Sequence, residues 1–291
     1  MQLGQEPGHL RALSRVAELR VKRAEYDEAL DYAKRALAIN TYDPPANFIY
    51  GVANRALGRL ADAKDGFGWA ARSLEFRSAA NEELAELAIV ENDLDRAAEY
   101  AASSLEYNQL NLNARQVQAV VARMRHDRDG ADKALDGILA IDPLSHFARF
   151  ERALPQPGAA RWGEFAGLIR NELPHETYLE LALTYLRLGR EFEATRVLEM
   201  APVRPEGDLW LAYILKDEDP AKSQALFKRA FAASPELQKA VADTDYRSVR
   251  IKSFPFASEA WTFRKFTFVE TLAKLKELGV AAVEAFPGQA L

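Results

Sequence analysis

The chain has 291 residues, of which 48% are hydrophobic and 28% are charged, and its formal net charge is −5. No apolar run approaches the roughly 18–20 residues that a membrane-spanning helix needs, and Met1 to Gly8 lack the pattern of a secretory signal. We therefore expect a cytoplasmic protein without membrane insertion. The absence of cysteine excludes disulfides, thiolate metal sites and a cysteine nucleophile. Because acidic and basic residues are mixed along the chain rather than gathered in a basic stripe, nucleic acid is not an expected partner.

A repeat of 34 residues organises the first half of the chain. Four alanines recur at this spacing: Ala29, Ala63, Ala97 and Ala131. A second set, Asn40, Leu74, Asn108 and Asp142, marks where the second helix of each unit should stop, and Pro143 follows the last of them. The spacing predicts helix pairs, here called helix A and helix B, that bury their apolar faces by stacking.

The period continues after an interruption. A fifth unit runs from Tyr178 to Ala201, and its Ala194 lies 63 residues beyond Ala131 instead of 34. A sixth, degenerate unit extends from about Leu209 to Pro235, with a short first helix. The sequence thus predicts five clear pairs and one weak pair.

These features resemble the tetratricopeptide repeat family over residues 10–143 and 175–235. Unit two carries the pattern most fully, with small residues, a turn and an aromatic plug at Gly51, Gly58, Ala63, Phe67 and Ala70. The resemblance implies an all-α fold, a right-handed α-solenoid of helix pairs, and a scaffold that binds a protein or peptide partner. It does not imply an enzyme.

Some positions depart from the family pattern. The tryptophan often found early in helix A is replaced by Leu13, Asn47 and Asn81, which predicts looser or solvated packing there. Ala101 stands where an aromatic is usual. The run from Asp142 to Glu151 also resembles the repeat half of large bacterial proteins that carry an N-terminal β-sandwich domain, which implies that an upstream domain is missing.

The period fails between Arg149 and Pro174. A turn at 154–158 precedes a short apolar-faced helix that carries Trp162, Phe165, Leu168 and Ile169. We expect this inserted helix to pack against the neighbouring pairs, with a binding loop as the alternative.

The last residues follow a different pattern, and we place a boundary between a repeat domain, 1–235, and a segment at 236–291. Thr267 and Glu270 give a capping-box signature for one amphipathic helix. Apolar runs at 256–263 and 280–286 predict strands on either side, so a short βαβ-like appendage is expected.

Residues 250–291 resemble the opening of a sugar phosphate isomerase/epimerase of the TIM-barrel type. Such a barrel needs about 200 or more residues, and no metal ligand is carried over, not even Glu284 at the end of the second strand. The resemblance implies, as the alternative function, a fragment of such an enzyme in a fusion or truncated protein, inactive as it stands.

No other pattern indicates catalysis, a metal site or a cofactor. The four histidines, His9, His126, His146 and His175, lie in separate units without metal-ligand spacing. Each is expected at the surface or in a turn.

Recognition is then the expected function, through the concave groove that helix A lines in tetratricopeptide arrays. Three positions of the repeat assign the following groove residues: Ser14, Glu18, Phe48, Val52, Arg55, Glu82, Glu86, Ile89, Gln116, Val120 and Arg123. The charged members are expected to be accessible to solvent, whereas Val52, Ile89 and Val120 could instead pack between helices.

The groove has an acidic centre, and it lacks the lysine and asparagine clamp that chaperone-binding relatives use for a C-terminal carboxylate. We therefore expect a peptide with basic or apolar side chains as the ligand.

Overall fold

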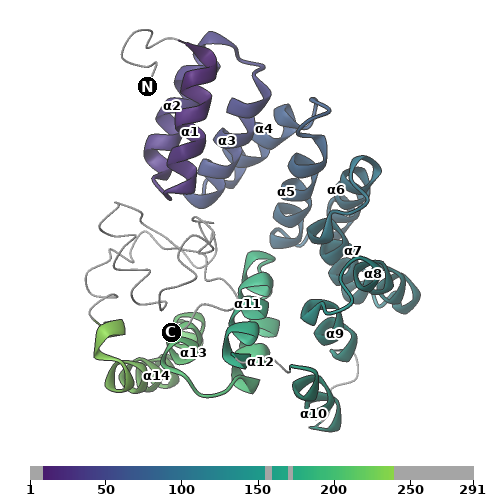
Figure 1. Cartoon of the computed structure of the whole chain (residues 1–291), viewed down its shortest axis with the longest axis vertical. Helices are drawn as coiled ribbons and strands as arrows, with labels where there is room; N and C mark the ends of the chain where they lie inside the picture. Colours follow the sequence, from purple (N-terminus) through teal and green to yellow (C-terminus); the bar gives the residue numbers. More distant parts are fainter. Residues whose placement is uncertain (1–8, 155–158, 170–172, 239–291) are drawn as a thin grey trace. The chain divides into compact units, whose positions relative to one another are not determined.

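The computed structural model describes residues 9–154, 159–169 and 173–238, and every regular element in these ranges is an α-helix (Figure 1). The chain divides into two compact units, residues 1–161 and 162–291, which are described separately. The predicted strands at 256–263 and 280–286 and the helix between them lie outside the described residues. The division of the chain at 235/236 stays a prediction.

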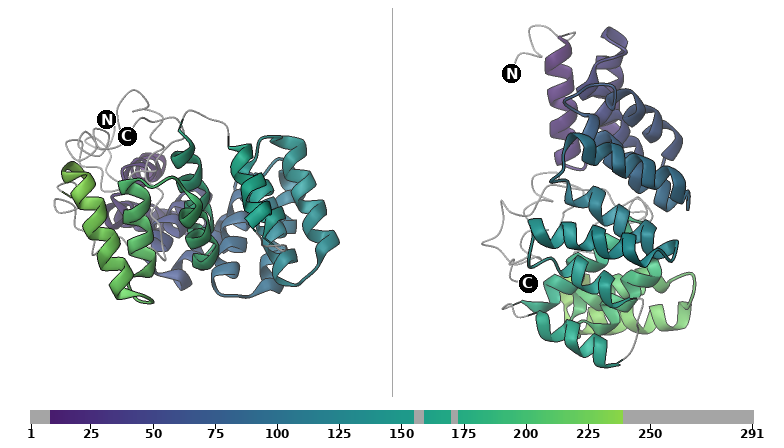
Figure 2. Two further views of the ribbon diagram at one scale, coloured as in Figure 1. Left: turned by 90° about the horizontal axis from the view of Figure 1, so that it is seen from below. Right: turned by 90° about the vertical axis from the view of Figure 1, so that its right-hand side faces the viewer.

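Unit 1 contains four predicted helix pairs. The A helices are α1 (Leu10–Lys22), α3 (Pro44–Ala56), α5 (Arg77–Val90) and α7 (Leu112–Met124), and the B helices are α2 (Tyr26–Ile39), α4 (Leu60–Ala70), α6 (Leu94–Tyr107) and α8 (Arg128–Ile141). A further helix, α9 (His146–Ala153), follows them, and α10 (Ala159–Leu168) spans the division between the units. Each helix packs on the next one along the chain, so the pairs stack side by side (Figure 2).

A left-handed residue turns the chain from each A helix into its B helix. Ala24, Gly58, Asn92 and His126 have φ between 57° and 73°, and they lie 34 residues apart. At each turn the next N–H donates to a carbonyl five residues earlier, as from Asp93 to Ala88 at 2.8 Å. This pattern closes the end of a helix whose last carbonyls have no partner inside the helix.

The start of each A helix also follows the period. His9, Asp43, Asn111 and Ser145 precede α1, α3, α7 and α9, and each side chain accepts a hydrogen bond from a backbone N–H in the first turn. Such N-caps stabilise a helix by about 1 kcal/mol each. The helix α5 is the exception, because the equivalent position is Arg77, the first residue of that helix.

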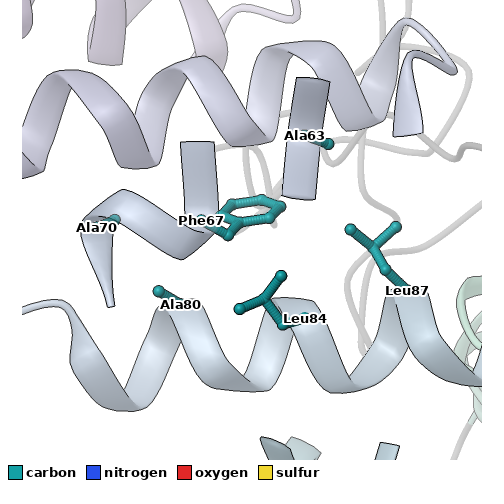
Figure 3. Packing of buried hydrophobic residues seen from close by; sticks show 6 residues of the cluster. All are labelled: Ala63, Phe67, Ala70, Ala80, Leu84 and Leu87. Carbon is teal, nitrogen blue, oxygen red and sulfur yellow. The ribbon is translucent and has the colours of Figure 1, made fainter. Parts of the chain in front are cut away.

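The repeated alanines and glycines let the helices of unit two approach closely. Ala63 and Phe67 are fully buried, and Figure 3 shows the Phe67 ring pointing toward the helix of Leu84 and Leu87. A Cβ atom added to Gly66 would lie 2.7 Å from the carbonyl oxygen of Asn47 in the facing helix. No larger residue fits that contact without moving the backbone.

The expectation of loose packing at the missing tryptophans is wrong. Leu13, Asn47 and Asn81 are buried, with exposed fractions of 1%, 4% and 8%. Asn47 Nδ2 donates to the carbonyls of Thr41 and Asp43, and Asn81 Nδ2 donates to that of Arg77. These asparagines satisfy backbone acceptors at the start of the helix, so a buried amide replaces the aromatic ring. 

The position of Ala101 is also fully buried, and the neighbouring Tyr100 packs on the Phe67 cluster. An aromatic ring is thus supplied one residue earlier than in the family pattern.

Unit 2 contains the two remaining predicted pairs. They are α11 (Pro174–Arg187) with α12 (Glu191–Met200), and α13 (Pro205–Leu215) with α14 (Pro220–Ala233). Gly189, with φ 66°, turns α11 into α12 at the position that is 63 residues beyond His126. The interruption predicted between Ala131 and Ala194 therefore preserves the turn of the repeat.

The inserted helix predicted near residue 162 is α10. Phe165 is 2% exposed, and its ring centroid lies 6.1 Å from that of Tyr178 in an edge-on contact. Ile169 is buried as well, but Leu168 is 46% exposed. The expected apolar face is thus narrower than the sequence indicated, because Leu168 turns away from the neighbouring pair.

Candidate protein-binding surface

The predicted groove residues lie on the A helices of unit 1. They occupy three repeated positions: the first holds Ser14, Phe48, Glu82 and Gln116, the second holds Glu18, Val52, Glu86 and Val120, and the third holds Arg55, Ile89 and Arg123. The parallel A helices α1, α3, α5 and α7 place equivalent positions side by side along the array.

Burial divides this set. Ser14, Glu86, Ile89 and Val120 are buried, and the other seven residues are partly exposed. Val52 packs against the cluster around Phe67. The packing alternative therefore holds for Val52, Ile89 and Val120, which contribute to the contact between helices.

Phe48 covers the core of unit two. Its ring centroid lies 5.5 Å from that of Phe67 and 5.3 Å from that of Phe76. Since the ring stays partly exposed, Phe48 is an apolar floor that a ligand could contact without any rearrangement of the core.

Arg55 crosses from α3 to two glutamates of α5. Its Nη2 donates to Glu86 Oε2 at 2.7 Å, and its Nη1 pairs with Glu83. Burial lowers the pKa of Arg55, but attraction to Glu83 and Glu86 outweighs this effect, so the net shift is upward. The guanidinium is thus fixed in its charged form, and Glu86, expected at the solvent-facing surface, is only 1% exposed.

The same pair recurs two repeats later. Arg123 on α7 pairs with Glu151 on α9, and each residue lies 68 positions beyond Arg55 and Glu83 respectively. Glu151 is also 1% exposed. Between these two pairs, the equivalent residues are the buried Ile89 and Val117. Contacts between successive A helices therefore alternate between ionic and apolar.

The first contact of the series fits this alternation. Val21 packs against the cluster that contains Ile49, and these residues lie 34 positions before Arg55 and Glu83. Sequence reasoning assigned Arg55 and Arg123 to the groove but missed Glu83 and Glu151. A comparison of positions two periods apart, rather than one, would have found both partners.

At the first repeat the charged residues lie nearer to solvent. Glu18 pairs with Arg15 and with Lys22, the latter at 3.0 Å. Burial raises the pKa of Glu18, but hydrogen bonds from Lys22 and Arg15 lower it further, so the net shift is downward. Ser14 Oγ donates to Asp43 Oδ2 at 3.1 Å, the carboxylate that also caps α3. Ser14 therefore links α1 to the start of α3 instead of facing a ligand.

The histidines have structural positions in the described residues. His9 caps α1, and His126 occupies a left-handed turn. Burial lowers the pKa of His146 and of His175, with further repulsion from Arg149 and Arg204 respectively. Within the described ranges no three His, Cys, Asp or Glu side chains are placed to hold a metal ion, and no helix is long and apolar enough to cross a membrane.

Comparison with known proteins supports the repeat fold. No protein-family model and no curated protein sequence matches the chain. A solved tetratricopeptide repeat protein from Parabacteroides merdae matches with a TM-score of 0.50 and 15% identity, over 84% of this chain and 98% of that one. The C-terminal part of a TPR repeat-containing protein from Cytophaga hutchinsonii matches with a TM-score of 0.47 and 16% identity, over 83% of this chain and 90% of that one.

At these identities the likeness shows the fold alone. The predicted all-α solenoid is confirmed, and the chain has the helical repeat architecture of tetratricopeptide proteins, a scaffold suited to protein interaction. The matches give no support to the resemblance between residues 250–291 and a sugar phosphate isomerase. 

Proposed function

We propose that the chain is an interaction scaffold that binds a peptide or protein partner through the A-helix face of unit 1. The face has an apolar floor at Phe48 and Val52, which pack on the core and stay partly exposed. Its polar side chains are held by contacts between successive helices, so little conformational entropy remains to be lost when a ligand binds.

The charge at the centre of this face carries the proposed ligand chemistry. Three carboxylates, Glu82, Glu83 and Glu86, lie on α5 around the single guanidinium of Arg55. The excess negative charge favours a ligand with lysine or arginine side chains, and the apolar floor beside it favours an adjacent apolar side chain.

A peptide array tests this proposal. Each basic and apolar peptide is paired with a version in which glutamate replaces lysine, and the array is probed with the full chain. We expect the lysine versions to be retained by the wild-type chain and released by the variant Glu18→Lys/Glu82→Lys. Both sites are partly exposed, which makes them suitable for charge reversal.

The matched control reverses two acids on B helices. Asp31 on α2 and Glu99 on α6 are exposed, so Asp31→Lys/Glu99→Lys changes the net charge equally but leaves the A-helix face intact. Equal retention of the lysine peptides by both variants would show that net charge, and not this face, governs binding. Retention unaffected by Glu18→Lys/Glu82→Lys would reject the proposal.

A further inference from the structure

A second surface lies outside the A-helix face, at the edge where each B helix passes to the next A helix. This connection edge comprises residues 40–43, 71–76, 108–111 and 142–145. Because the A helices of unit 1 run parallel, their N-terminal ends and the connections before them lie along one side of that unit. The edge combines exposed apolar side chains with arginines that form no ion pair.

Each connection exposes one large apolar side chain. The residues are Tyr42, Leu74, Leu110 and Leu144, with exposed fractions between 67% and 73%. Three of them are held by the same turn, in which the side-chain oxygen of Asn40, Asn108 or Asp142 accepts the N–H two residues later. This turn fixes the local backbone, so the apolar residues recur along the edge in a set orientation.

Aromatic rings extend the apolar surface in the first two connections. Tyr42 lies against Trp69 with ring centroids 5.0 Å apart, and Trp69 remains 37% exposed. The guanidinium of Arg72 lies 4.0 Å from the Trp69 ring centroid. Arg77 lies over Tyr107 at 4.7 Å, and its Nη1 donates to the Tyr107 hydroxyl at 2.7 Å.

Four arginines on this edge have no carboxylate partner among the described residues. Arg72 stacks on Trp69, and the others donate to carbonyls of the connections: Arg77 to Ala71 and Arg72, Arg115 to Gln109, and Arg149 to Pro143. The opposite edge differs, since cations there pair with acids, as Arg20 does with Glu25 and Arg125 with Asp95.

The acids of the connection edge do not neutralise these arginines. Asp43 caps α3 and accepts from Ser14, and Asp142 accepts from the N–H of Leu144. Glu75 and Glu106 are exposed on the same edge and pair with no cation in the described ranges. Four guanidiniums therefore face two uncommitted carboxylates, and the edge as a whole is complementary to an acidic ligand.

We propose that this edge binds an extended acidic segment of a partner protein that carries an apolar residue at every third position. Successive A helices contact one another, and packed helices lie about 8–10 Å apart. A polyproline II segment advances about 9 Å in three residues, so consecutive apolar side chains can reach consecutive connections. Carboxylates between them meet the arginines.

The probe is a labelled peptide of four Leu-Glu-Pro triplets, and its counterpart has lysine in place of glutamate. Each is titrated to about 1 mM against the full chain by fluorescence anisotropy. We expect saturable binding of the glutamate peptide, weakened by added salt because the charges are exposed. The lysine peptide should bind at least about tenfold more weakly.

The test variant is Arg72→Glu/Leu74→Ser/Leu110→Ser, which alters exposed side chains only. The matched control is Phe192→Ser/Arg196→Glu, because that pair is an exposed arginine over an exposed aromatic ring in unit 2. We expect Kd for the glutamate peptide to rise about tenfold or more in the first variant and to stay unchanged in the control.

Three results would overturn the proposal: no binding of the glutamate peptide by the wild-type chain, equal binding of the two peptides, or equal Kd in the edge variant and the wild type. A fourth is self-association in sedimentation velocity that the edge variant abolishes, since the edge would then bind a second copy of the chain. Because the A-helix face is untouched, the outcome is independent of the proposed function.

Discussion

The left-handed residues at the A-to-B turns set the sharpest requirement on single side chains. Glycine takes this conformation without strain, whereas a residue with a Cβ atom pays about 1–2 kcal/mol. Gly58 and Gly189 meet the requirement, but His126, with φ 59°, does not.

We therefore predict that His126→Gly raises the free energy of unfolding by about 0.5–1 kcal/mol, because it removes the strain at an exposed site. Gly58→Ala should lower the free energy by about 1 kcal/mol through the reverse change. Urea denaturation measures both, with His126→Ala as the control that removes the ring and keeps the strain. A gain in His126→Ala equal to that in His126→Gly would place the effect in the ring and not in the backbone.

The alternation along the A helices gives a second prediction at the residue scale. Arg55→Ala leaves Glu86 buried without its cation, and losing one partner of a buried ion pair costs about 3–5 kcal/mol. The triple change Arg55→Ile/Glu83→Val/Glu86→Val instead installs the residues that stand one repeat later, Ile89, Val117 and Val120. Its unfolding free energy should lie within about 2 kcal/mol of the wild type.

Thermal unfolding of both variants separates a structural ion pair from a replaceable one. If the triple variant is as unstable as Arg55→Ala, the apolar contact of the next repeat does not transfer, and the alternation has no energetic meaning.

At the scale of elements, the helix α4 contains two glycines with opposite roles. A methyl group at Gly66 would meet backbone atoms of Asn47 and Gly51, whereas one at Gly68 meets nothing within 4 Å. Helix propensity alone favours alanine over glycine by about 1 kcal/mol at either site. The contact with α3 should reverse this sign at Gly66, where overpacking costs about 1–3 kcal/mol.

We predict that Gly68→Ala raises the melting temperature and that Gly66→Ala lowers it. Differential scanning calorimetry of the two variants checks the signs, and each serves as the control for the other. An increase in both would mean that α3 and α4 are less tightly packed than the described contact requires.

The elements were predictable because the repeat fixes them several times over. Alanine, helix stop and turn recur in one register, so an error in one unit is corrected by the next, and even the interrupted period before Ala194 could be located. Asn47 and Glu86 were misjudged because polarity suggests solvent. Their burial depends on partners in another helix or on turn carbonyls, which local sequence does not reveal.

The binding surfaces were less predictable than the helices. The phase of helix A placed the groove residues on the correct helices, but it could not separate partly exposed Glu82 from buried Glu86. The connection edge was missed altogether, because an exposed leucine in a loop is unremarkable alone. Its meaning comes from repetition beside unpaired arginines, and that requires the tertiary arrangement.

For the whole molecule, stacking of near neighbours implies that stability is local. Each helix of unit 1 packs mainly on the helices next to it, and the chain divides into two compact units. In such arrays the free energy is approximately a sum of repeat terms and nearest-neighbour interface terms. A change at one interface should then loosen the adjacent pairs and leave distant pairs unaffected.

Arg55→Ala is the appropriate change, because Arg55 links α3 to α5. We predict that hydrogen exchange followed by mass spectrometry shows lower protection in α3 to α6 and unchanged protection in α11 to α14, since exchange reports the free energy of local opening. The control is Arg96→Ala, whose exposed pair with Asp93 contributes at most about 1 kcal/mol. An equal loss of protection in all helices would mean that the chain opens as one cooperative unit, and the nearest-neighbour description would then be wrong.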